Sequence, residues 1–145
     1  MLFRSGCYDL YAYFQEPSCM IKSHTIKLIP TGIKSAFDKK RRIAFRERGS
    51  NTKTGLILMS GQIDSGYRGE WFIALYNTNP YDVVISKQFS DITYNGAYLE
   101  VPYTKALCQF AIEQVPQDDI RECSLEEIEN YKSERGSGKL GSSGK

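Results

Sequence analysis

Short runs of aromatic and β-branched residues constrain the fold of this chain more than any other feature. The runs lie at 8–14, 20–29, 32–37, 42–48, 55–59, 70–77, 83–89 and 106–115. Turn residues separate them roughly every eight to twelve positions, as in Pro30-Thr31-Gly32, Asp64-Ser65-Gly66 and Asn95-Gly96. Short strands with this spacing are typical of all-β sandwiches and barrels. We therefore expect an all-β domain.

The last part of the sequence departs from this pattern twice. Ser124-Leu125-Glu126-Glu127 is a capping box, with serine at the N-cap and glutamate at the third helical position, and it predicts one short helix. From Gly136 onward the chain is rich in glycine and serine, a composition typical of a flexible arm. We expect a β domain over residues 1–132 and a mobile arm over 133–145.

Composition excludes several classes of function. The 145 residues carry a formal charge of only +2, so no broad positive field favours nucleic acid. The basic run Lys39-Lys40-Arg41-Arg42 is typical of a solvated loop and strand edge. No apolar run approaches the roughly 18 residues of a membrane helix, so no membrane partner is expected. The four cysteines form no CxxC pair and no signal peptide opens the chain, which favours a reduced cytoplasmic protein.

One turn, Gly61-Gln62-Ile63-Asp64-Ser65-Gly66-Tyr67-Arg68-Gly69, combines groups that suit a nucleotide pocket. Asp64 is a candidate general base, and Tyr67 supplies a ring that could face a sugar. The plainer interpretation is that Asp-Ser-Gly is a favourable turn sequence in itself. The other motifs of the chain decide between the two.

Five segments resemble, in order, the five motifs of the trimeric dUTPase family. They are Gly6-Cys7-Tyr8-Asp9-Leu10-Tyr11, Arg48-Gly49-Ser50, Gly61 to Gly69, Ala106-Leu107-Cys108-Gln109-Phe110 and Arg135 to Gly144. The resemblance spans nearly the whole chain, and the third motif is the strongest match. It implies a jelly-roll-like β-barrel (the dUTPase-like, or β-clip, fold) with a Gly-rich C-terminal arm. It also implies a homotrimer whose sites lie between subunits, and Mg²⁺-dependent hydrolysis of dUTP to dUMP and pyrophosphate.

The resemblance assigns roles residue by residue. Asp64 would activate the water that attacks the α-phosphorus, and Tyr67 would pack under the deoxyribose and exclude a ribose hydroxyl. Backbone groups of a β-hairpin before Asp64, roughly Leu56 to Ile63, would read uracil, including those of Gly61, Gln62 and Ile63. Phosphate contacts would come from Arg48, Gly49, Ser50, Gln109 and Arg135, and the arm would close with Leu140, Gly141 and Ser142. Asp9 would reach Mg²⁺ through water.

The chain also departs from the family pattern. Leu140 stands where the arm usually carries a phenylalanine that stacks on uracil, which predicts weaker capping and a higher KM. Cys7 replaces a glycine of the first motif, and Glu47 replaces the proline before Arg48.

Two other functions compete with dUTP hydrolysis. The related dCTP deaminases need a glutamate three residues before an asparagine, where this chain has Ala74 ahead of Asn77, so deamination is disfavoured. The remaining alternative is a regulatory protein that binds dUTP and, gated by it, another protein.

Overall fold

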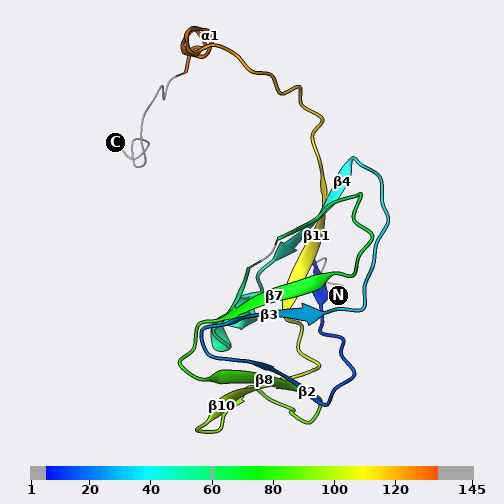
Figure 1. The fold of residues 1–145 in the computed structure, drawn as a ribbon, viewed down its shortest axis with the longest axis vertical. Coiled ribbons are helices and arrows are strands. Elements are labelled where there is room, and N and C mark those ends of the chain that lie inside the picture. The colour runs from blue at the N-terminus through cyan, green and yellow to red at the C-terminus, as the bar shows by residue number, and fades with distance from the viewer. Residues whose placement is uncertain (1–5, 60, 134–145) are drawn as a thin grey trace, which may run out of the picture.

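The computed structural model describes residues 6–59 and 61–133. An elongated body of strands contains the N-terminal side of the chain, and the segment after the last strand leads away from it to a short helix (Figure 1). The predicted all-β class with one short α-helix is confirmed. Arg135, Leu140, Gly141 and Ser142, and the arm from 134 onward, lie outside the described residues.

The strands form three sheets. The first has the order β1 (Tyr8–Leu10), β11 (Cys108–Gln114), β4 (Arg41–Arg46), β6 (Gln62–Ile63); the second β2 (Ser18–Ile21), β8 (Asp82–Ser86), β10 (Tyr98–Pro102), β9 (Thr93–Tyr94); the third β3 (Ile26–Pro30), β7 (Phe72–Asn77), β5 (Leu56–Leu58). Neighbouring strands are antiparallel except β8 and β10, which are parallel. No ladder among the described residues closes a sheet on itself, so the jelly-roll-like barrel stays a prediction.

Burial along the strands shows where the core lies. On β7 the side chains of Ile73 and Leu75 are fully buried, whereas their neighbour Phe72 is exposed. The same inward face continues through Ile29 of β3 and Val101 of β10. An aromatic group packs on the first sheet: the centroid of the Trp71 ring lies 5.8 Å from that of Phe45 and 5.3 Å from that of Phe110.

Two strand predictions were wrong, and one strand was missed. The run 20–29 is divided into β2 and β3 by a turn at His24, whose φ of 53° lies in the left-handed region. The run 32–37 forms no strand, because Glu70 accepts the backbone N–H groups of Thr31 and Gly32 that a ladder would use. Strand β10 was missed because Tyr98–Pro102 contains a glutamate and ends in proline.

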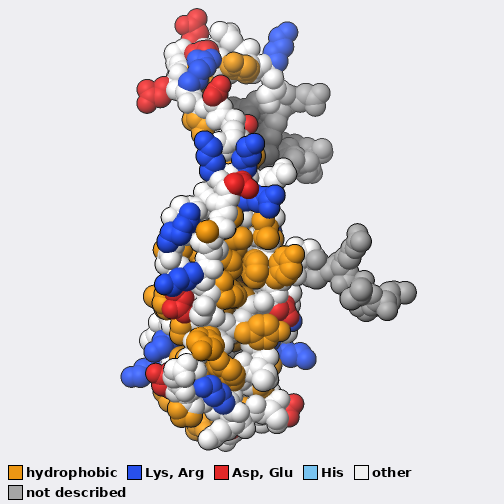
Figure 2. Space-filling view, turned by 90° about the vertical axis from the view of Figure 1, so that its right-hand side faces the viewer, with side chains coloured by type: hydrophobic (Ala, Val, Ile, Leu, Met, Phe, Trp, Pro, Cys, Tyr) orange, Lys and Arg blue, Asp and Glu red, His pale blue; other side chains and the backbone are white. Residues whose placement is uncertain are grey.

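The tail carries the predicted helix, α1 (Leu125–Glu129). Ser124 caps it as expected: the backbone N–H of Glu127 donates to the Ser124 hydroxyl at 3.1 Å. Charged side chains of both signs gather around this helix, whereas hydrophobic side chains cover much of the strand body (Figure 2). In the part of the chain that the structure describes, no helix has the length and apolar character needed to cross a membrane.

Candidate functional site

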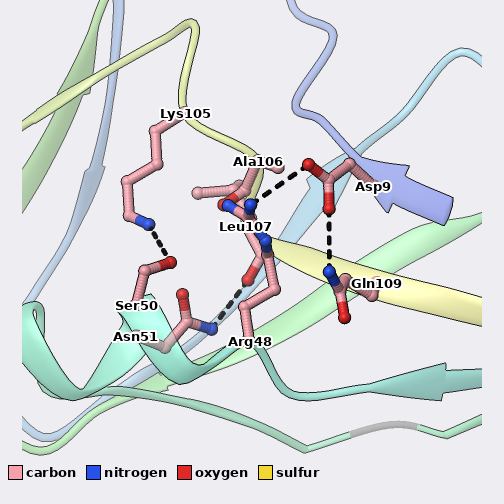
Figure 3. Close-up of polar contacts among 8 residues, drawn as sticks. All are labelled: Asp9, Arg48, Ser50, Asn51, Lys105, Ala106, Leu107 and Gln109. Carbon is pink, nitrogen blue, oxygen red and sulfur yellow. Dashed lines mark hydrogen bonds and ion pairs between the residues drawn. The ribbon is translucent and has the colours of Figure 1, made fainter. Parts of the chain in front are cut away.

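Strand pairing brings the first and fourth motifs together. Asp9 of β1 lies opposite Gln109 of β11, and the Gln109 side-chain amide donates to Asp9 Oδ1 at 3.0 Å. Arg48 Nη2 donates to the other carboxylate oxygen, Oδ2, at 3.1 Å. Both members of this ion pair are partly exposed, Arg48 by 25% and Asp9 by 32%. Figure 3 shows the three side chains converging from β1, β11 and the end of β4.

The second motif begins where β4 ends. Arg48 is the N-cap residue of η1, a 3-10 helix over Gly49–Lys53. Its Nη1 donates to the carbonyl of Ala106 at 3.2 Å, which ties this turn to the segment before β11. The hydroxyl of Ser50 accepts a hydrogen bond from Lys105 Nζ at 2.7 Å. We call Asp9, Arg48, Ser50 and Gln109 the anion cluster.

The third motif forms a separate feature, the aspartate turn, over residues 64–67. The backbone N–H of Tyr67 donates to the Asp64 carbonyl at 3.1 Å, which closes a β-turn directly after β6. The Tyr67 hydroxyl donates to the Glu70 carbonyl at 2.9 Å and so fixes the ring. Asp64 is exposed, and no hydrogen bond between described residues involves its carboxylate.

The two features lie at opposite ends of β4. Ile63 pairs with Ile43 in an antiparallel ladder, so the next residue, Asp64, lies beside Arg42. Arg42 precedes Arg48 by six positions. At about 3.3 Å per residue, the Asp64 and Arg48 backbones are roughly 20 Å apart. One chain therefore does not bring Asp64 and Tyr67 to Arg48, Ser50 and Gln109. Each chain therefore presents the predicted site residues as two separate groups.

The predicted uracil hairpin before Asp64 is wrong in its pairing. Strand β5 pairs with β7 of the third sheet, whereas β6 pairs with β4 of the first. Both long strands, β4 and β7, offer a ladder partner, so the two short strands separate instead of joining each other. The carbonyl of Gly61 accepts from the backbone N–H of Phe45 at 2.7 Å, while the side chain of Gln62 is exposed and that of Ile63 is half-buried.

Three further residues of this region were missed in the sequence. Asn51 is buried, and its amide donates to the Leu107 carbonyl at 2.8 Å and to Glu47 at 3.0 Å. Glu47 in turn accepts the backbone N–H of Leu58. Lys105 directly precedes the fourth motif, and that position was the only sign of its role. Asn51 gave no sign beyond its neighbourhood to Arg48, and Glu47 stood out only because it replaces a proline of the family pattern.

Burial shapes the acid–base properties of this region. Burial raises the pKa of the Cys108 thiol to about 12, so this cysteine stays protonated and packs as an apolar residue. Burial also lowers the pKa of Lys105, and repulsion from Arg48 lowers it further.

A magnesium ion suits Asp9 by its chemistry. The carboxylate is one-third exposed, and each oxygen accepts one hydrogen bond, which leaves lone pairs for water. Across residues 6–59 and 61–133, no three His, Cys, Asp and Glu side chains come together as a preformed metal site. Magnesium is commonly held by few carboxylates together with water and substrate phosphates, and a single carboxylate fits that pattern.

The chain was compared with protein families, curated proteins and solved structures. No protein-family model matches it. It is 32% identical over 140 residues to the deoxyuridine 5'-triphosphate nucleotidohydrolase of Candida albicans, covering 95% of this chain and 74% of the relative.

Two phage structures share the fold. The dUTPase G164S mutant of Staphylococcus bacteriophage 80alpha with dUpNHpp has a TM-score of 0.73 at 19% identity, over 99% of this chain and 88% of that one. The D95N mutant dUTPase from phage phi11 of S. aureus, described with a structural Mg(II) ion, has a TM-score of 0.62 at 18% identity, over 82% and 83% of the two chains. Because the likeness to the Candida protein spans 95% of this chain, the chain belongs to the deoxyuridine 5'-triphosphate nucleotidohydrolases, the dUTPases.

Proposed function

We propose that this chain hydrolyses dUTP to dUMP and pyrophosphate, with Asp64 activating the attacking water. The observation that carries this proposal is the pair of features described above, in a member of the dUTPase family. The anion cluster offers a guanidinium, a hydroxyl and an amide suited to phosphate oxygens. The aspartate turn offers an accessible carboxylate beside a fixed aromatic ring.

Asp64 is suited to take a proton from water. Its carboxylate is exposed and has no hydrogen-bond partner among the described residues, so both oxygens are available to water. In the proposed step, Asp64 accepts the proton as the water oxygen bonds to the α-phosphorus, and the bond to the pyrophosphate oxygen breaks. Positioning by the protein holds the water in line with the leaving group.

Selection of a deoxyuridine would depend on Tyr67 and on backbone groups. A ring held by its hydrogen bond to Glu70 presents a flat face to the sugar, and a ribose 2′-hydroxyl would collide with it. We propose that N–H and C=O groups around Gly61, Gln62 and Ile63 read uracil. Gly61 and β6 pair with β4, which orders this backbone, although β5 and β6 do not pair with each other among the described residues.

The phosphates would bind at Arg48, Gly49, Ser50 and Gln109. Gly49 has open space where a side chain would project, so a phosphate oxygen could approach its backbone. Bound Mg²⁺ would neutralise phosphate charge, with Asp9 holding it through water. The phage phi11 relative, described with a structural Mg(II) ion, supports this cofactor.

We propose that the complete site forms between copies in a homotrimer. Asp64 and Arg48 are too far apart in one chain to act on one α-phosphate, so a second copy must supply one of them. The third sheet offers a surface for such contact. Its outward face is apolar, with Ile26, Leu28, Ile57, Met59 and Phe72 each between 39% and 58% exposed. The registers Ile26–Tyr76–Ile57, Leu28–Ala74 and Pro30–Phe72 place these side chains in successive rows of the sheet.

The remaining predictions belong to the same proposal. Residues 1–132 would form the β domain, with its sheets arranged as a jelly-roll-like barrel, and residues 133–145 a mobile arm. Arg135 would meet the γ-phosphate while Leu140, Gly141 and Ser142 cover the nucleotide. Cys19, Cys108 and Cys123 are free thiols, which supports a cytoplasmic location.

The test is a pyrophosphate-release assay with dUTP, dTTP, dCTP and UTP, with and without Mg²⁺. We expect turnover of dUTP alone among the four. Ammonia release from dCTP would instead indicate deamination. Tight binding of dUTP without turnover at any enzyme concentration would contradict hydrolysis and favour the regulatory alternative.

A further inference from the structure

Lys105 occupies an unusual place beside the anion cluster. It lies in the turn between β10 and β11, where its backbone N–H donates to the Pro102 carbonyl at 3.0 Å. Its side chain crosses to η1 and donates to the Ser50 hydroxyl at 2.7 Å (Figure 3). Lysine side chains usually extend into water, whereas this one is half-buried and directed at a residue expected to bind phosphate.

The charges of the cluster show why a second cation matters. Asp9 forms an ion pair with Arg48, so the charge of Arg48 is partly neutralised before any ligand arrives. Among the described cluster residues Arg48 is the only cation, and a triphosphate carries several negative charges. Lys105 restores a net positive charge at this place.

The energetics of Lys105 favour an anionic ligand. Burial and repulsion from Arg48 both lower its pKa, so the ammonium group is held in an unfavourable position in the free chain. A phosphate oxygen bound between Lys105 and Arg48 would relieve that repulsion. Ser50 is also able to serve both partners, because its oxygen accepts from Lys105 while its O–H remains available to donate to phosphate.

From this geometry we propose that Lys105 is an additional polyphosphate-binding residue, acting with Ser50 and Arg48 on the phosphate chain of the nucleotide. This inference rests on the proposed function, because it concerns the same site. The Lys105–Ser50 pair then acts as one unit: the lysine supplies charge, and the hydroxyl sets its position.

The experiment measures equilibrium binding of an α,β-imido analogue of dUTP, with Mg²⁺, to the wild-type chain and to Lys105→Met. The analogue resists hydrolysis, so binding is separated from turnover. Loss of one charge-assisted contact should weaken binding by about 10- to 100-fold. Lys105→Arg should restore most of the affinity, since charge and reach are kept. Deoxyuridine, which has no phosphate, should bind both variants equally.

Lys53→Met is the matched control. Lys53 is exposed and close enough to influence Lys105 electrostatically, but it has no bond to Ser50. An equal loss of affinity in both variants would mean that Lys105 contributes only long-range positive charge, as Lys53 does, and would overturn the proposal. So would binding of the analogue by Lys105→Met within about twofold of wild type.

Salt dependence separates contact from structure. Binding by the wild type should weaken more steeply with ionic strength than binding by Lys105→Met, because one screened interaction is lost. A role limited to supporting η1 would lower the melting temperature and leave that slope unchanged. Turnover of dUTP by the wild type is measured separately. A chain that binds the analogue but does not hydrolyse dUTP would refute the proposed reaction, while the binding comparison would still decide the role of Lys105.

Discussion

The ring of Tyr67 lies directly over Gly69. A Cβ atom built on Gly69 would come within 2.5 Å of Tyr67 Cζ and 2.9 Å of Cε2, closer than real Cβ contacts allow. Together with the hydrogen bond from the Tyr67 hydroxyl to the Glu70 carbonyl, this close approach sets the ring on the aspartate turn. With the Tyr67 ring in this place, Gly69 has no room for a side chain, whereas Gly66 of the aspartate turn has open space around it.

Replacing Gly69 by alanine should displace the Tyr67 ring without removing it. We expect the preference for dUTP over UTP, measured as a ratio of kcat/KM values, to fall by about 10-fold or more. Gly66→Ala is the control, because its added methyl group meets no other atom. Equal loss of sugar discrimination in both variants would contradict the role of the ring.

Glu113 connects two arginines across the first sheet. Arg42 Nε donates to it at 3.0 Å and Arg46 forms a second ion pair. The hydrogen bond from Arg42, followed by that from Arg46, lowers the pKa of Glu113 below its ordinary value of 4.5. A lowered folded pKa means that the stabilising effect is present above the unfolded value and is lost as the pH falls through the folded one.

Glu113→Gln should therefore lower the melting temperature slightly at pH 7 and not at all at a pH below the folded pKa. The difference should also shrink in high salt, because the group is at the surface. Glu129→Gln, on the exposed helix α1, is the control. A difference between wild type and Glu113→Gln that persists unchanged to low pH would contradict this interpretation.

The sequence predicted local features well and long-range ones poorly. The cap at Ser124 and the turn at Asp64 depend on neighbouring residues, and both were foreseen. The pairing of β6 with β4 was not, because the choice between two ladder partners depends on strands far away in the sequence. Lys105 and Ser50 are 55 positions apart, so only the fold reveals their contact. The separation of Asp64 from Arg48 likewise follows from register, which composition does not fix.

In the proposed homotrimer, the outward face of the third sheet should form the contact between copies. Leu28 is 58% exposed at its centre, opposite Ala74. Leu28→Lys places a charge in an apolar contact, so we expect dissociation of the oligomer in sedimentation analysis together with loss of dUTP turnover. Ile112→Lys, at a similarly exposed position on β11, is the control. A variant that stays oligomeric and active would move the interface to another face.

Asp64→Asn tests the proposed base. The amide cannot accept a proton from water at neutral pH, so turnover of dUTP should fall by about 10²–10⁴-fold or more. Because Asp64 makes no hydrogen bond among the described residues, the melting temperature should not change. Affinity for the α,β-imido analogue should stay close to wild type. Retention of more than about a tenth of the activity would exclude Asp64 as the base.

Mixing two inactive variants tests whether sites are shared between copies. Asp64→Asn keeps Arg48, and Arg48→Met keeps Asp64, so a site built from both copies is complete when each supplies its intact residue. If the two are unfolded together at equal amounts and refolded, random assembly makes about one quarter of shared sites complete, and activity should return to about that fraction. Each variant refolded alone controls for recovery. Sites built within one chain would contain a defect in every case, so a mixture as inactive as its components would show that Asp64 and Arg48 act from the same copy.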